Sequence, residues 1–376
     1  MSAEQVVSTA AHAFLPPSSA SRWVPCPASA SMEALYPEAD SDKAAEGTLA
    51  HAVWAAMQQG RPIPDGASEE MLDGAEMMQD VVDNICAGRP GVRPIIEHRL
   101  DRNNRKLFHP DNWGTPDCTI FDIPHRKLWV IDYKFGHRYV SPFENYQLLN
   151  YAILEMSREL SGKIEEGIEV HLIIVQPRNY HPDGPVREWV LMSDDLWSYR
   201  TVLEGAAVLA HAPNPPAKTN PECRDCKARG NCATLQAAAY EAIEVSSTAT
   251  PFDMPIEAKG RELVMLTSAV AMLESRISGL EVEVLNHIKQ GNPVVGWMSK
   301  QGEGRKKWTM GVDEVLALGT MMGVDVSKPA LLTPAQAVKA GLSPDVVDSY
   351  SAKAPGEVKL IRDTGAFARK IFQGVK

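Results

Sequence analysis

The sequence predicts an α/β fold in which helices flank a mixed central sheet, followed by a smaller helical or α+β module at the C-terminal end. Short apolar runs of strand length alternate with longer segments of helical periodicity in the first two thirds of the chain. Residues 245–256 are rich in serine, threonine and proline, which is typical of a linker. One long helical pattern follows that linker and leads into short mixed elements.

Composition limits the class of protein. The chain has 376 residues, 44% of them hydrophobic and 23% charged, with a net charge of −10. Its length predicts two or three domains, and its acidic balance argues mildly against a protein that coats nucleic acid. We find no run of about 18 apolar residues and no signal peptide at residues 1–20. We therefore expect a cytoplasmic protein with no membrane partner.

The N-terminal part is expected to be helical. Residues 1–20 are small and polar and predict a flexible lead-in, after which 21–244 forms the main domain. Cys26 lies in a Trp-Val-Pro-Cys-Pro context before a short helical stretch. Leucine, valine and methionine at helical spacing predict a helix over 46–57, and a second helix is expected over 69–87.

The centre of the chain has the pattern of a sheet. Strands are expected at 94–100, with a hairpin partner at 106–109, and at 118–122, 127–134, 169–176 and 189–192. Helices are expected at 143–160 and 194–211. A proline-rich segment, 213–221, cannot be helical and leads to Cys223, after which helical sequence resumes to about residue 244.

The C-terminal part begins with a long helix, expected over 257–291. Apolar residues recur every three or four positions from 263 to 284, which predicts about 30 helical residues and roughly 45 Å of length. This coiled-coil-like seam packs on its own domain or, alternatively, forms an oligomer through 263–288. A small module is expected over 292–376, with a hairpin at 297–310 and helices at 312–322, 333–340 and 344–351.

Two carboxylates and a lysine are expected at neighbouring strand ends. Asp117 follows a turn, and Asp132 and Lys134 share one side of their strand because side chains alternate. Mg²⁺ prefers oxygen ligands, so these aspartates and the Tyr133 carbonyl could hold Mg²⁺ or Mn²⁺. The ion would stabilise phosphate charge and activate a water, which Lys134 could orient. Taken alone, Asp-x-Lys is usually only a solvated strand end.

The combination resembles the PD-(D/E)XK nuclease superfamily, which has a restriction-endonuclease-like fold. Pro116-Asp117 and Asp132-Tyr133-Lys134 match its two halves. The sequence is also similar to the branch that contains RecB-type and AddB-type nuclease domains and the CRISPR-adaptation nucleases. That branch places a histidine in a Gly-Thr-x-x-His setting and a later Gln-x-x-x-Tyr on a helix, as Gly47 to His51 and Gln147 to Tyr151 do here.

The resemblance assigns further site residues. It implies that His51 is another metal ligand, and that Gln147 and Tyr151 support the site or contact the nucleic acid backbone. Glu97 would be one more acidic contributor or, alternatively, a surface glutamate at a strand edge. The histidine alone would equally be a capped or solvated helical residue.

Three cysteines are closely spaced after the proline-rich segment. Cys223, Cys226 and Cys232 follow a C-x2-C-x5-C pattern, which indicates a metal site but is one ligand short of the usual four. The resemblance supplies Cys26 as the fourth and implies a 4Fe–4S cluster that holds the domain together. Structural Zn²⁺ is the alternative, and unliganded surface cysteines are a third interpretation.

The resemblance implies a metal-dependent DNA nuclease, an exonuclease acting on single-stranded or duplex DNA ends. The pattern is similar to phage- or prophage-encoded members, which implies recombination or DNA processing in a bacterial host and a recombination or annealing protein as partner. One alternative is a non-catalytic DNA-binding or assembly protein that retains the nuclease fold. Another is a redox or sensor protein in which the cysteine cluster is primary.

Overall fold

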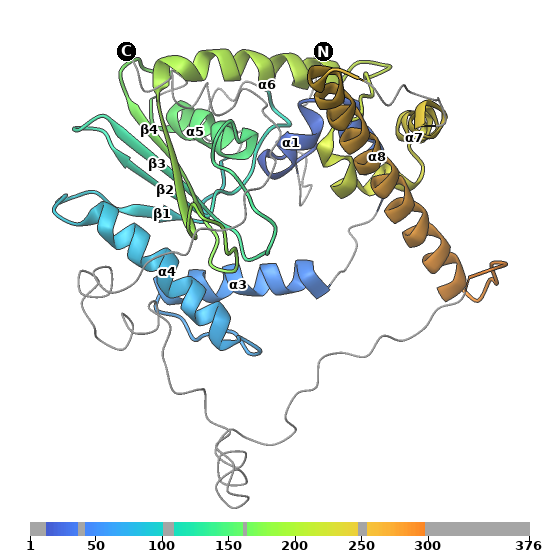
Figure 1. Ribbon diagram of the computed structural model, residues 1–376. Coiled ribbons are helices and arrows are strands. Elements are labelled where there is room, and N and C mark those ends of the chain that lie inside the picture. Colours follow the sequence, from blue (N-terminus) through green and yellow to red (C-terminus); the bar gives the residue numbers. More distant parts are fainter. Residues whose placement is uncertain (1–12, 37–41, 101–108, 161–163, 247–253, 298–376) are drawn as a thin grey trace, which may run out of the picture. The chain divides into compact units, whose positions relative to one another are not determined.

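A five-stranded mixed sheet lies at the centre of the protein (Figure 1). The structure, a computed structural model, describes residues 13–36, 42–100, 109–160, 164–246 and 254–297. The strands are β1 (Pro94–Ile96), β2 (Cys118–Asp122), β3 (Lys127–Tyr133), β4 (Glu169–Val175) and β5 (Val186–Met192), and they lie in that order across the sheet. Only β3 and β4 pair in parallel among these strands. The predicted α/β class with a mixed sheet and flanking helices is confirmed.

Helices cover both faces of this sheet. Figure 1 shows α3 (Asp42–Gln58) and α4 (Glu69–Cys86) on one side, and α5 (Tyr146–Glu159) and α6 (Leu196–Ala210) on the other. A hydrophobic core lies on each face of the sheet, and β3 contributes to both because its side chains alternate between the faces. Ile131 packs with the residues of α3 and α4, whereas Val130 packs with those of α5 and α6.

The N-terminal segment packs into the α5–α6 side of the protein. It contains η1 (Pro17–Ser19), α1 (Ala20–Trp23) and α2 (Ala28–Glu33). Leu15 is fully buried in the same core as α5, and its amide donates to the Asp111 carbonyl at 3.0 Å. The chain is therefore anchored from about residue 14, before the expected start of the main domain.

The cysteine-bearing segment is short and irregular and is followed by two helices. Its elements are η4 (Pro221–Asp225) and η5 (Lys227–Gly230), after which come α7 (Ala233–Ser246) and α8 (Ile256–Lys289). The long helix α8 contacts α7, η4 and η5. Although the sequence has no uninterrupted apolar run of that length, α8 is long and apolar enough by composition to cross a membrane. Its buried residues, Ser275 and Gly279, lie on the part that packs against the cysteine segment.

Two strand boundaries differ from the sequence prediction. Strand β1 ends at Ile96 because Glu97 has a φ of 45°, which interrupts extended backbone. It pairs with β2, whereas the expected hairpin partner, 106–109, lies outside the described residues except for His109, which is not in a strand. Strand β5 begins three residues earlier than expected, at Val186.

The chain groups into two compact units, one of residues 1–290 with 365–376 and one of residues 291–364. All the elements named above belong to the first unit. The hairpin and helices expected beyond residue 297 lie outside the described residues.

Candidate functional site

The candidate site lies where β2 begins and β3 ends. Cys118 pairs with Ile131 in the antiparallel register of these strands, which brings Asp117, just before β2, beside the last residues of β3. The Tyr133 amide donates to Asp117 Oδ2 at 2.7 Å. Backbone pairing therefore places the two candidate carboxylates, Asp117 and Asp132, next to each other.

The α5 side of the site is a closed triangle of polar contacts. Lys134 Nζ lies 3.0 Å from Asp132 Oδ2 and donates to Gln147 Oε1 at 3.0 Å. Gln147 Nε2 in turn donates to Asp132 Oδ1 at 2.7 Å. The helix begins at this point because the Asn145 side chain accepts hydrogen bonds from the first amides of α5. Its cap thus fixes Gln147 over the end of β3.

The α3 side of the site is provided by His51. Its Nδ1 atom lies 3.2 Å from Asp117 Oδ1, and its ring centroid lies 5.3 Å from that of Tyr133. The Tyr133 ring packs in the α3–α4 core, so the side chains of Tyr133 and Asp132 point to opposite faces of the sheet. Of Tyr133, only the main chain borders the carboxylates.

Two further predicted residues contact the backbone around Asp117. Tyr151 donates its hydroxyl to the Thr115 carbonyl at 3.0 Å and thereby supports the turn before Asp117. The Glu97 amide donates to the Asp117 carbonyl at 3.0 Å, in the left-handed conformation noted above. Burial, and then the charge of Asp117, raise the pKa of the Glu97 carboxyl above its usual range.

The pKa values of the two aspartates shift in opposite directions. Burial raises the pKa of Asp132, and the attraction of Lys134 does not offset burial and the Asp117 carboxylate together. Burial also disfavours charge on Asp117, but His51, with further help from Lys134 and the Tyr133 amide, holds the Asp117 pKa below its usual range. The same aspartates raise the pKa of Lys134 and of His51 despite their burial. The site therefore holds two carboxylates beside two groups, Lys134 and His51, whose positive charge those carboxylates favour.

The donor set suits a hard divalent cation. It offers two carboxylates, an imidazole and nearby backbone carbonyls, and Asp132 Oδ2 is buried without a hydrogen bond. Within the described residues, however, these groups do not supply three ligand atoms that all lie within 4.8 Å of one another. The Lys134–Asp132 and His51–Asp117 contacts hold the carboxylates in their present positions. A cation would bind as those contacts open.

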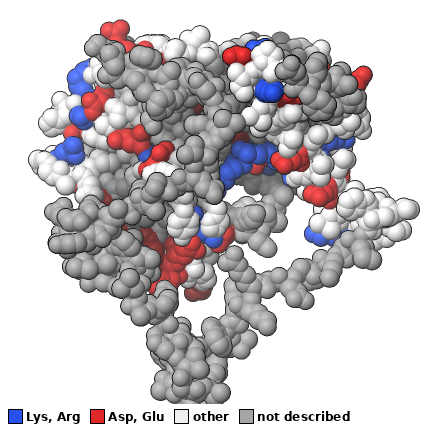
Figure 2. Space-filling model, viewed as in Figure 1, with Lys and Arg blue, Asp and Glu red and all other residues white. Residues whose placement is uncertain are grey.

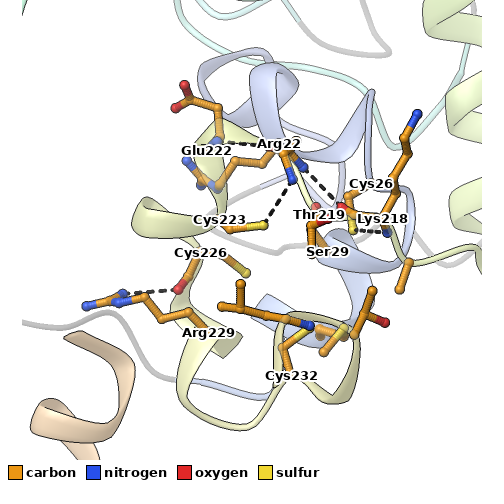
Figure 3. Close-up of a pocket in the computed structure, with 15 residues that line it drawn as sticks. Arg22, Cys26, Ser29, Lys218, Thr219, Glu222, Cys223, Cys226, Arg229 and Cys232 are labelled. Carbon is orange, nitrogen blue, oxygen red and sulfur yellow. Dashed lines mark hydrogen bonds between the residues drawn. The ribbon is translucent and has the colours of Figure 1, made fainter. Parts of the chain in front are cut away.

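The structure brings the four cysteines to one cavity, which Figure 3 shows. Cys26 lies between α1 and α2, Cys223 is in η4, Cys226 follows it, and Cys232 precedes α7. Burial, and then the charge of Glu33, raise the pKa of the Cys226 thiol to about 12. Of the six cysteines in the sequence, Cys86 and Cys118 lie elsewhere, in the α3–α4 core.

Backbone amides point at three of the four sulfur atoms. The amides of Lys218, Asn220 and Leu235 donate at 3.3–3.4 Å to Cys26, Cys223 and Cys232, respectively. The fourth cysteine, Cys226, is the one whose thiol pKa is raised most clearly by burial. No three of the four sulfur atoms, all in described residues, lie within 4.8 Å of one another. The four sulfur atoms therefore do not stand at the spacing expected of ligands to a single ion.

A hollow lies between the candidate active site and the cysteine cavity. Its lining includes Lys134, Arg138 and Arg224, and Arg22, which also lines the cysteine cavity. Carboxylates also line it, and Arg138 Nη1 pairs with Asp225 Oδ2 at 2.7 Å. On the face drawn in Figure 2, Lys and Arg side chains gather beside a hollow near the middle of the molecule.

The site residues predicted from sequence come together to different degrees. His51, Asp117, Asp132, Lys134 and Gln147 form a chain of direct contacts, together with the Tyr133 amide. Tyr151 is one step removed, on the Thr115 carbonyl. Sequence reasoning missed Arg22 and Arg138, because isolated arginines in N-terminal and loop sequence have no distinguishing pattern.

A family model described as "Protein of unknown function (DUF2800)" matches residues 12–364. The match extends over the main domain, α8 and the whole unit of residues 291–364. It names no activity and no nuclease superfamily.

Proposed function

The chain belongs to the DUF2800 family, whose function is unknown, and we propose that this member is a metal-dependent deoxyribonuclease with a PD-(D/E)XK fold. The observation that carries the proposal is the contact network of Asp117, Asp132, Lys134 and Gln147 at the adjoining ends of β2 and β3. His51 completes it from the opposite side of the sheet. These residues come from α3, the adjoining ends of β2 and β3, and the start of α5, so a common functional site explains their convergence better than a solvated strand end does.

Each residue has a defined task in phosphodiester hydrolysis. Asp117, Asp132, His51 and the Tyr133 carbonyl would hold Mg²⁺ or Mn²⁺, which supplies charge stabilisation and an activated water when bound. Lys134 holds a positive charge beside the carboxylates and would orient the attacking water or stabilise the developing phosphate charge. Gln147 fixes Lys134 and Asp132 relative to each other, and Tyr151 fixes the turn that presents Asp117.

The hollow next to Lys134 is the proposed path of the DNA strand. Arg22, Arg138 and Arg224 line this track, and each would turn from a carboxylate partner (Glu33 for Arg22, Asp225 for Arg138 and Arg224) to bind phosphates. Such a track suits a single strand or an end better than the outside of a duplex, in keeping with exonuclease action. By the resemblance described above, the substrate is phage-type recombination or processing DNA in the cytoplasm of a bacterial host, and the partner is a recombination or annealing protein.

The four cysteines are proposed to hold a 4Fe–4S cluster. Zinc bound by thiolates at about 2.3 Å would place the sulfur atoms roughly 4 Å apart. Three sulfurs so arranged would lie within 4.8 Å of one another, and these do not. The backbone amides directed at three of the sulfurs are also suited to thiolates that ligate a cluster. Structural Zn²⁺ is the outcome that metal analysis would reveal in place of iron.

The nuclease is tested with Lys134→Ala on end-labelled single-stranded and duplex DNA in the presence of Mg²⁺ or Mn²⁺. We expect wild type to degrade DNA and Lys134→Ala to lose on the order of 1,000-fold in rate, as for loss of a group that stabilises transition-state charge. Lys127→Ala is the matched control, because Lys127 lies at the other end of β3 and pairs with Glu169 outside the site. It should retain wild-type activity.

Equal activity of wild type and Lys134→Ala would contradict the catalytic assignment. DNA binding by wild type without any cleavage under either metal would instead support a non-catalytic DNA-binding or assembly protein. Blocking the 5′ or 3′ end of the labelled strand shows whether cleavage requires a free end and from which end it proceeds.

A further inference from the structure

A second group of metal-ligand residues lies away from both the active site and the cysteines. His109, Asp111 and His211 each offer a ligand atom, and these three atoms all lie within 4.8 Å of one another. His109 and Asp111 are half-buried and His211 is exposed, so a cation could reach them from solvent. Two imidazoles and one carboxylate are a ligand set typical of divalent transition metals.

The hydrogen bonds of His211 favour a cation at this position. Its Nδ1 lies 2.8 Å from the Ala207 carbonyl, which can only accept, so Nδ1 carries the proton. The other nitrogen, Nε2, lies 2.9 Å from Asp111 Oδ2. On the neutral ring the Nε2 lone pair faces the Asp111 carboxylate, and either a second proton on the ring or a metal ion bound to Nε2 would make this contact favourable. Metal-bound histidines commonly donate their second ring N–H to a backbone carbonyl in this way.

The surroundings supply the rest of the site. The His109 ring centroid lies 4.3 Å from that of His211, so the second imidazole is close enough to share one ion. The Asp111 amide donates to His109 Nδ1 at 3.2 Å, a long hydrogen bond with which a cation would compete. His211 is also the C-cap of α6, where the helix dipole favours positive charge. Phe14 packs edge-on against the His211 ring at 5.0 Å and covers one side.

We propose that His109, Asp111 and His211 form a structural binding site for one divalent transition-metal ion of the zinc class. The ion joins the C-terminal end of α6 to the segment that leads to Asp117. This segment is already held by Asn112, which is buried and donates to the Leu15 carbonyl at 2.7 Å. The site would thus brace the turn before β2, and the proposal does not depend on the nuclease assignment.

The test counts Co²⁺ bound by the untagged full-length protein, using equilibrium dialysis and elemental analysis. We expect wild type to hold one more Co²⁺ per chain than His211→Ala and Asp111→Asn, with affinity at this site falling on the order of 100-fold or more in the variants. Binding at the cysteines and at the active site is common to all of these proteins and cancels in the comparison. The isosteric Asp111→Asn change keeps the test decisive if His211→Ala does not fold.

The matched control is His125→Ala. His125 also faces a carboxylate, with Nδ1 2.8 Å from Asp122 Oδ2, but it belongs to no such three-residue group among the described residues. This control should bind as much Co²⁺ as wild type. A second measurement is the melting temperature, which Co²⁺ at about 100 times its Kd for this site should raise by about 5 °C more in wild type and His125→Ala than in His211→Ala and Asp111→Asn. Equal Co²⁺ content in wild type, His211→Ala and Asp111→Asn would overturn the proposal.

Discussion

Glu155 is a fully buried carboxylate on α5, in the middle of the main domain. It accepts hydrogen bonds from Arg158 and lies 2.8 Å from His98 Nε2. Burial disfavours its charge, but His98 and Arg158 outweigh this and hold the pKa of Glu155 below its usual range. The ionised carboxylate therefore stabilises the folded protein, and it joins α5 to the segment after β1.

We predict that Glu155→Gln lowers the free energy of unfolding by about 2 kcal/mol at pH 7, because hydrogen bonds to a charged group are lost. Since the folded pKa is depressed, the contribution of Glu155 is fully present above its unfolded value of 4.5 and is lost as the pH falls through the folded pKa. Urea denaturation at pH 7 and near pH 4 would measure this. If the difference in free energy of unfolding between wild type and Glu155→Gln grew on acidification, the predicted direction of the pKa shift of Glu155 would be wrong.

At the same scale, alternation along a strand was enough to predict that Asp132 and Lys134 share a side, and their 3.0 Å contact agrees. The approach of His51 to Asp117 could be expected only from the family resemblance, because tertiary packing of α3 brings them together. The His109–Asp111–His211 group was not foreseen at all. Its members come from a bend and a helix end that are 100 residues or more apart, and no local periodicity connects them.

At the scale of elements, helix α8 approaches the cysteine segment through two glycines. A Cβ atom on Gly279 would lie 2.6 Å from the Gly230 amide nitrogen, closer than real contacts allow. The same approach is held by Arg276, which donates to the Gly230 carbonyl, and by Asn231, which donates to Glu283 at 2.8 Å. The helix is therefore seated on backbone, which cannot move aside as a flexible side chain would.

We predict that Gly279→Ala separates α8 from η5 and destabilises their contact by about 1–3 kcal/mol. Amide hydrogen exchange should then rise across the middle of α8. Gly260→Ala is the control on the same helix, because nothing lies within 4 Å of its added Cβ. It should stabilise the helix by up to about 1 kcal/mol. Unchanged exchange in Gly279→Ala would show that the two backbones do not pack this closely.

Most elements could be predicted because their sequences carry local signals. The apolar run of β4 and the hairpin of β2 and β3 were expected within one residue of their observed ends. Strand β1 was expected to be longer because φ at Glu97 is not visible in a sequence that remains favourable for a strand. Strand β5 was expected to be shorter because Arg187, although buried, interrupts the alternation of apolar residues.

At the scale of the whole molecule, cysteines from the two ends of the main domain line one cavity. Cys26 and Cys223 are 197 residues apart by subtraction and line the same cavity. The amide of Lys227 also donates to Glu33 Oε1 at 2.9 Å, so α2 and the cysteine segment are held together by more than the sulfurs. A cluster bound there would close a loop of about 197 residues and so reduce the conformational entropy of the unfolded chain.

We predict that Cys26→Ser abolishes the absorption near 400 nm that the proposed cluster would give. It should also lower the free energy of unfolding by at most about 5 kcal/mol, the loop-closure value for a link of this length. Iron and sulfide analysis with thermal melting, carried out without oxygen, measures both effects. Cys86→Ser is the control, because Cys86 packs in the α3–α4 core away from the cavity. Zinc without iron in wild type would identify the alternative metal.

The order of the sheet, β1-β2-β3-β4-β5, follows the order of synthesis. Every strand can therefore join a neighbour that the ribosome has already released. The cysteines, by contrast, are synthesised far apart in time. At about 5–20 residues per second, roughly 10–40 s pass between the synthesis of Cys26 and that of Cys223. Assembly of any shared metal centre is thus a late event in biogenesis, and until then Cys26 is a free thiol open to oxidation.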